Sequence, residues 1–173
     1  VHDPVIAKDG DSYWIFSTGH GVPVRSSKDF KDWTYVGPAL EGVPQWALRH
    51  VPKVEFPWAP DISFFNQRFH LYYSISTIGS RQSCIGLATN KTLDPTSPQY
   101  KWMDQGVVVF STEKDNLNCI DPNVVLDERK KPWLTFGSYW SGIYLVQLNP
   151  TTGKPGGGQP LNIASRNGGA IEA

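Results

Sequence analysis

The feature that most constrains the fold is an internal repeat. Residues 2–6, 59–63 and 120–124 read HDPVI, APDIS and IDPNV, and each is followed by a polar turn, an aromatic strand and a glycine-led strand. A fourth element starts with tryptophan in the first two units, whereas the third unit shows only a turn at residues 149–153. The aspartates that open the units are 58 and 60 residues apart. A four-stranded unit that repeats on the order of 50 residues is the sequence signature of a β-propeller blade.

Strand-like segments fill the repeats, and long helices are not expected. The chain has 16 glycines and 14 prolines, which interrupt it at short intervals. Between them lie aromatic and β-branched runs that suit a pleated, half-buried surface, the clearest being residues 12–16, 69–75, 133–136 and 143–148. One helical turn is expected in the connection at residues 45–50. The fold class is therefore predicted to be all-β.

The repeat spacing divides the chain into blades of one partial β-propeller domain, residues 1–173. Blade 1 is expected at about 1–56, blade 2 at about 57–117 and blade 3 at about 118–168, and residues 169–173 start a fourth. Three blades cannot close a ring, and their exposed strand edges favour pairing with another copy or with complementary blades. The chain alone is therefore expected to self-associate.

Charge and composition argue against several classes of partner. Lys plus Arg total 16, as do Asp plus Glu, so the net charge is zero and no basic excess is available to displace counterions from phosphates. No nucleic-acid partner is expected. No apolar stretch approaches the roughly 20 residues of a spanning helix, and no signal sequence opens the chain, so no membrane partner is expected either. Cys84 and Cys119 are expected to be buried free thiols.

The repeat predicts a cluster of acidic residues from positions far apart in the chain. The first strand of each propeller blade lines the central channel, so acidic residues at equivalent positions in successive units should face one another. These residues are Asp3, Asp61, Asp121 and Glu172. Clustered carboxylates repel one another, and their pKa values are driven apart. Among aromatic side chains, such a cluster suits glycoside hydrolysis, in which one carboxyl group protonates the leaving oxygen and another activates water.

Six short motifs occur in a fixed order along essentially the whole chain. They are residues 2–5 (HDPV), 58–62 (WAPDI), 85–89 (IGLAT), 120–123 (IDPN), 136–143 (FGSYWSGI) and 170–173 (AIEA). Together they resemble glycoside hydrolase family 43, specifically its endo-1,5-α-L-arabinanases. The resemblance implies a five-bladed β-propeller that cleaves arabinan, a plant cell-wall polysaccharide, with inversion of configuration. It also implies a secreted protein.

The same resemblance implies roles for individual residues. Asp3 matches the general base, Glu172 the general acid, and Asp121 the carboxylate that raises the pKa of the acid and orients it. In an inverting enzyme the acid and the base are about 6.5–9.5 Å apart, which leaves room for the water. The residues expected to contact substrate are His2, Trp58, Asp61, Asn118, Ser138 and Trp140.

Several of these residues have structural interpretations as well. His2 is equally consistent with a packed, hydrogen-bonded channel residue, and Asp61 with a residue that ties down the start of its strand. Trp58 and Trp140 suit core packing as well as sugar stacking. Ile78 stands where members of the family usually have an aromatic residue, which argues against one of the family's sugar-stacking subsites.

The chain also departs from the family in length. Family members are considerably longer, so this chain is expected to be an amino-terminal portion that ends at the acid. The channel histidine that helps hold calcium or another metal in the complete propeller is not in it, and no cofactor or metal site is expected in this chain. Two alternative functions remain open: an exo-acting α-L-arabinofuranosidase or β-xylosidase of the same fold, and a non-catalytic sugar-binding or assembly fragment.

Overall fold

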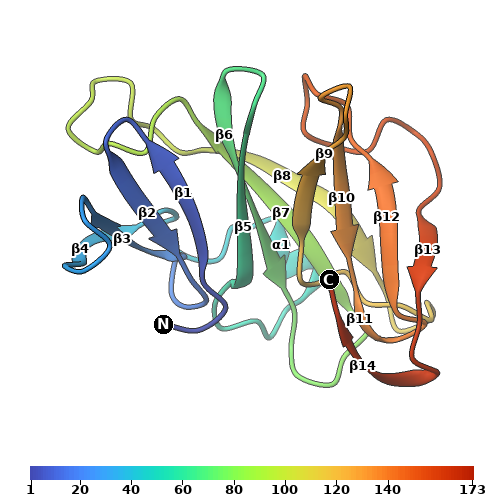
Figure 1. Cartoon of the computed structure of the whole chain (residues 1–173). Helices are drawn as coiled ribbons and strands as arrows, with labels where there is room; N and C mark the ends of the chain where they lie inside the picture. Colours follow the sequence, from blue (N-terminus) through green and yellow to red (C-terminus); the bar gives the residue numbers. More distant parts are fainter.

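The computed structural model describes residues 1–173 and contains three four-stranded antiparallel sheets that follow one another along the chain (Figure 1). Sheet 1 contains β1 (Val5–Asp9), β2 (Ser12–Phe16), β3 (Pro23–Ser27) and β4 (Thr34–Pro38). Sheet 2 contains β5 (Trp58–Phe65), β6 (Arg68–Ile75), β7 (Ser83–Asn90) and β8 (Met103–Ser111). Sheet 3 contains β9 (Asn123–Leu126), β10 (Pro132–Phe136), β12 (Ile143–Gln147) and β13 (Leu161–Ala164).

Within each sheet the strands are neighbours in chain order, because turns reverse the chain after each strand. Sheet 3 departs from this order once: β11 (Ser138–Trp140) leaves the sheet and pairs with β14 (Gly168–Glu172). The one helix, α1 (Ala47–His50), lies in the connection between sheets 1 and 2. It is far too short to cross a bilayer, and the chain has no other helix that would.

The predicted all-β class, the four clearest strands and the helical turn are confirmed, but the third unit contains a strand that the sequence did not predict. Only a turn was expected after β12, whereas β13 forms the fourth strand of sheet 3 and pairs Leu161 with Leu145. This strand is hard to see in the sequence because it has four residues, none of them aromatic, and follows a run of three glycines at 156–158. Both cysteines are buried free thiols, as predicted.

Sheet 2 is buried on both faces and joins the two parts of the core. One core cluster contains Leu71 and Tyr73 of β6 together with Trp14 of sheet 1. The other contains Tyr72 of β6 together with Leu134 of sheet 3. Successive residues of a strand point to opposite faces, so β6 supplies both clusters. Seven of the eight residues of β6 and all eight of β7 are buried for this reason.

Two adjacent tyrosines on opposite faces of β6 differ in how their hydroxyl groups are satisfied. Tyr72 and Tyr73 are both 0% exposed. The Tyr72 hydroxyl donates to the Gly153 carbonyl at 2.7 Å and so links sheet 2 to the loop after β12. The Tyr73 hydroxyl has no hydrogen-bond partner, and its ring lies so close to Gly86 that a Cβ there would be 2.5 Å from the ring.

These tyrosines provide a matched test of the core. Tyr72→Phe is expected to lower the free energy of unfolding by about 1–3 kcal/mol, because the Gly153 carbonyl loses its partner in a buried site. Tyr73→Phe is expected to be neutral or stabilising, because it removes a buried hydroxyl that is already unsatisfied. Urea unfolding of both variants and the wild type measures the difference. Equal destabilisation by the two substitutions would contradict this account of the core.

Candidate active site

The four acidic residues of the repeat line one cavity. It has a volume of about 260 Å³, and its walls include Asp3, Asp61, Asp121 and Glu172. Asp3 and Asp121 precede β1 and β9, the first strands of sheets 1 and 3, whereas Asp61 lies in β5 and Glu172 ends β14. The chain therefore brings together carboxyl groups that are separated by more than 50 residues along the sequence.

A left-handed backbone conformation marks the residue that opens each unit. Asp3 and Asp121 have φ values of 45° and 55°, and each precedes a proline. In the second unit the corresponding residue is Ala59, with φ 36°, which also precedes a proline. The expected equivalence of Asp61 with Asp3 is therefore wrong by two residues, because the aspartate of this unit follows its proline instead of preceding it.

Hydrogen bonds between sheets support the same alignment. The Ala59 N–H donates to Thr18 Oγ1 of the preceding unit at 2.7 Å, and the Asp121 N–H donates to Ser74 Oγ at 2.9 Å. In both cases a hydroxyl from the second-strand segment of one sheet accepts the N–H of the residue that opens the next unit. These contacts fix where each following sheet begins.

Asp61 ties sheet 2 to sheet 3. Its side chain is buried, and Oδ2 accepts the Val124 N–H at 3.0 Å and the Ser63 hydroxyl at 3.3 Å. Burial raises the pKa of Asp61 to about 6, and the hydrogen bonds from Val124 and Ser63 act in the opposite direction. The geometry supports the strand-tying interpretation of Asp61, and the carboxyl group also faces the acidic cavity.

Asp121 is the residue of the Asp3–Asp121–Glu172 cluster whose pKa is clearly shifted. Its pKa is raised from 3.8 to about 6, mainly by burial and then by the charges of Glu172 and Asp3. The three carboxyl groups therefore interact. Asp121 is the most enclosed of the three. The role that the resemblance implies for it, raising the pKa of the acid Glu172, stays a prediction.

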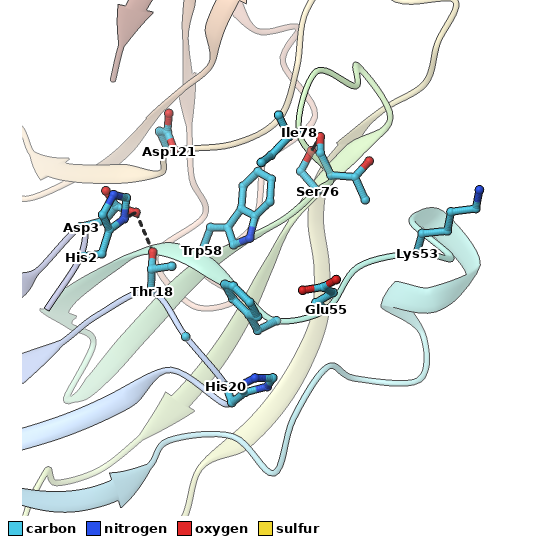
Figure 2. Close-up of a pocket in the computed structure, with 13 residues that line it drawn as sticks. His2, Asp3, Thr18, His20, Lys53, Glu55, Trp58, Ser76, Ile78 and Asp121 are labelled. Carbon is cyan, nitrogen blue, oxygen red and sulfur yellow. Dashed lines mark hydrogen bonds and ion pairs between the residues drawn. The ribbon is translucent and has the colours of Figure 1, made fainter.

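Asp3 and His2 form a hydrogen-bonded pair at the edge of the cluster. The Nδ1 atom of His2 lies 2.7 Å from Asp3 Oδ2, and the two side chains are 81% and 39% exposed. His2 is thus hydrogen-bonded but exposed, which does not fit the packed alternative, and its contact with substrate stays a prediction. Asp3 Oδ2 also accepts the Thr18 hydroxyl at 2.6 Å (Figure 2).

A second, larger cavity of about 800 Å³ adjoins the cluster and shares Asp3 and Asp121 with it. Figure 2 shows these two residues toward one end of the view and Lys53 toward the other, with Trp58 between them. Ile78 projects at the cavity with 96% of its surface exposed. Sequence reasoning missed several lining residues, because their connections carry no repeat motif. They are Thr18, His20, Lys53, Glu55 and Phe56.

Three of the expected substrate contacts line neither cavity. Asn118 and Ser138 are buried, and Asn118 Oδ1 accepts the Ser138 N–H at 2.9 Å. Ser138 is in register with Glu172 in the β11–β14 pair, so these residues support the strand that carries Glu172. Trp140 is half-buried, and the guanidinium carbon of Arg81 lies 4.9 Å from its ring centroid. Their contact with substrate stays a prediction.

The chain offers no cluster suited to hold a metal ion. No group of three or more His, Cys, Asp or Glu side chains has the arrangement that a cation needs. The channel metal that the resemblance implies for the complete propeller stays a prediction, and no step proposed below depends on one.

Comparisons with known proteins agree with one another. Residues 1–172 match the sequence model of Glycosyl hydrolases family 43. The chain is 43% identical over 157 residues to the extracellular exo-α-(1→5)-L-arabinofuranosidase of Cellvibrio japonicus, a match covering 90% of this chain and 45% of that protein. It is 41% identical over 180 residues to an extracellular endo-α-(1→5)-L-arabinanase of Bacillus subtilis, covering 100% of this chain and 54% of that protein.

A solved structure shows the same similarity in three dimensions. The Cellvibrio cellulosa α-L-arabinanase in complex with arabinohexaose superposes with a TM-score of 0.87 at 42% identity. The superposition covers 91% of this chain and 50% of that one. The chain thus spans about half the length of the relatives that it matches.

The raised pKa of Asp121 predicts how replacing its carboxyl group with a neutral side chain changes the stability of the protein. Because the folded-state pKa of about 6 exceeds the ordinary value of 3.8, the stability that the protonated carboxyl contributes is present below pH 3.8 and is lost as the pH rises through 6. Asparagine stays neutral and tolerates a positive φ. Asp121→Asn is therefore expected to be more stable than wild type by about 1–2 kcal/mol at pH 8 and similar to it near pH 4.

Thermal unfolding at both pH values measures this effect, and Asp127→Asn is the matched control. The pKa of Asp127 is lowered, mainly by the hydrogen bond from the Lys131 N–H, so its asparagine variant should be less stable than wild type at pH 8. An Asp121→Asn variant that is destabilised at pH 8, as the control should be, would contradict the account of the cluster.

Proposed function

This chain belongs to glycosyl hydrolases family 43, and on that premise we propose that the protein is a secreted, inverting endo-1,5-α-L-arabinanase. The observation that carries the proposal is the convergence of Asp3, Asp121 and Glu172 on one cavity, beside a larger cavity lined by Trp58. An acid, a base and an aromatic surface are what hydrolysis of a glycosidic bond requires. The arabinan-cleaving relatives support the substrate class, and their extracellular location supports secretion.

The proposed reaction is a single displacement. Glu172 donates its proton to the oxygen of the leaving sugar while the bond to the anomeric carbon breaks. Asp3 removes a proton from a water molecule, and the water oxygen forms the new bond on the opposite face of the sugar. Asp121 shares the cavity with both and interacts electrostatically with both. A negative charge at Asp121 would favour the protonated form of the acid.

The proposed architecture is a five-bladed propeller of which this chain supplies blades 1 to 3 and, from residue 169, the start of blade 4. Three features support it: each sheet is a four-stranded antiparallel unit, sheet 2 packs against a neighbour on each face, and the units open onto one acidic cavity. Exposed apolar residues of sheet 3, such as Val125, Leu161 and Ile163, support self-association of the isolated chain.

An exo-acting enzyme is the second candidate function. The exo-acting relative from Cellvibrio japonicus matches this chain at 43% identity, slightly above the 41% of the endo-acting relative from Bacillus subtilis. Both modes would cleave the same type of bond with the same acid and base. They differ in whether the end or the interior of the polysaccharide is bound at the cleavage point. The size of the first products distinguishes them.

Glu172→Gln tests the proposed acid. Glutamine has nearly the same shape but cannot donate an acidic proton, so kcat of the full-length protein on linear arabinan is expected to fall at least about 100-fold. Glu128→Gln, at an exposed turn outside both cavities, is the matched control and should keep wild-type activity.

Chromatography of the products from the same assay separates the two modes of action. The wild type is expected to release a ladder of oligosaccharides in the first minutes, whereas arabinose alone would favour the exo-acting candidate. Equal activity of Glu172→Gln and wild type, or a wild type that does not cleave arabinan, would contradict the proposed function.

A further inference from the structure

Thr18 makes three hydrogen bonds at the junction of sheets 1 and 2. Its hydroxyl donates to Asp3 Oδ2 at 2.6 Å and accepts the Ala59 N–H at 2.7 Å. Its backbone N–H donates to the His2 carbonyl at 3.0 Å. Figure 2 shows the hydroxyl pointing toward Asp3, with a dashed line between them. Thr18 therefore holds the segment that carries Asp3 and, at the same time, the segment that opens sheet 2.

The direction of these bonds is fixed by chemistry. A backbone N–H only donates, so the Thr18 oxygen must be the acceptor in its bond to Ala59. The single hydroxyl proton then remains for Asp3, and an ionised carboxylate only accepts. The bond from Ala59 polarises the hydroxyl and strengthens its donation to the carboxylate. The hydroxyl is thus oriented toward the carboxyl group that would act as the general base.

The two oxygens of the Asp3 carboxylate are left in different states. Oδ2 is occupied by the Thr18 hydroxyl and by His2 Nδ1, at 2.6 and 2.7 Å. Oδ1 accepts no hydrogen bond from the protein, and Asp3 lines both cavities. The oxygen free to take a proton from water is therefore Oδ1, because the bonds from Thr18 and His2 both occupy Oδ2.

The backbone at Asp3 also needs support. A φ of 45° is unfavourable for a residue other than glycine and persists only where the surroundings hold it. The two bonds from Thr18, one to the His2 carbonyl and one to the Asp3 side chain, act on either side of this conformation. The Thr18 bonds thus fix both the backbone and the carboxylate of the residue.

The corresponding residue of the next unit shows that this role is specific to Thr18. Ser74 Oγ accepts the Asp121 N–H at 2.9 Å, just as Thr18 accepts the Ala59 N–H. Ser74 makes no hydrogen bond to a carboxylate, whereas Thr18 does. Joining one sheet to the next is therefore common to both hydroxyls, and of the two only the Thr18 hydroxyl also bonds to one of the proposed catalytic carboxyl groups.

We propose that Thr18 is a positioning residue for the general base: its hydroxyl, oriented by the Ala59 N–H, holds Asp3 Oδ2 so that Oδ1 faces the attacking water. The inference rests on the proposed function of Asp3. It is separable from that function, because the position of the carboxylate can be observed whether or not arabinan is cleaved.

The kinetic test compares Thr18→Val with Thr18→Ser in the full-length protein. Valine has the shape of threonine without the hydroxyl, so kcat on linear arabinan is expected to fall about 10- to 100-fold, with KM within about twofold of wild type. Serine keeps the hydroxyl and should restore most of kcat. Assays well below the unfolding temperature of each variant separate this effect from lost stability, since valine also leaves the Ala59 N–H unpaired.

Crystal structures of the two variants provide the second measurement. The Asp3 carboxylate is expected to rotate or become disordered in Thr18→Val and to keep its wild-type position in Thr18→Ser. A carboxylate that stays in place in Thr18→Val, or a kcat unchanged by that substitution, would overturn the proposal. A wild type that fails to cleave arabinan, together with a displaced carboxylate in Thr18→Val, would overturn the function assigned to the site and leave the positioning role standing.

Discussion

Sheets 2 and 3 of this protein begin at backbone N–H groups that bond to side-chain oxygens of the preceding unit. Thr18 accepts from Ala59, Ser74 from Asp121 and Asp61 from Val124. Buried N–H groups that lack partners are costly, so these bonds constrain where each new sheet begins. The cavities lie at the same junctions, because four of the residues that join the sheets also line them: Thr18, Ala59, Asp61 and Asp121.

Two carboxyl groups of the site lower the free energy of unfolding when they are ionised. Burial raises the pKa of Asp61 to about 6, and burial together with the charges of Glu172 and Asp3 raises that of Asp121 to about 6. Ionisation of either carboxyl therefore disfavours the folded state near neutral pH. Sheet 2 offsets this penalty by burying apolar side chains on both faces, in the two core clusters that it shares with sheets 1 and 3. A well-packed sheet can thus hold like charges close together, and interacting carboxyl groups are what acid–base catalysis needs.

The repeat made much of the fold and the acidic cluster predictable, because it sets strand spacing and places the start of each unit at one end of its sheet. The repeat could not predict details that depend on the order of individual residues or on segments without a motif. Asp61 resembles Asp3 by spacing, but the swapped order of aspartate and proline puts Ala59 at the equivalent position. The strand β13 lacks aromatic residues, and Thr18 carries no motif, so neither was predicted. The role of Thr18 depends on three contacts across the chain that only the folded structure shows.

The central claim is that an acid and a base in the acidic cavity act together with water in one displacement. Proton NMR of linear arabinan during the first minutes of hydrolysis by the full-length protein tests this most directly, because it identifies the anomer released before mutarotation. Inversion at an α-L-arabinofuranosidic bond gives the β-anomer first. Initial release of the α-anomer would mean retention through a covalent intermediate and would contradict the roles proposed for Asp3 and Glu172.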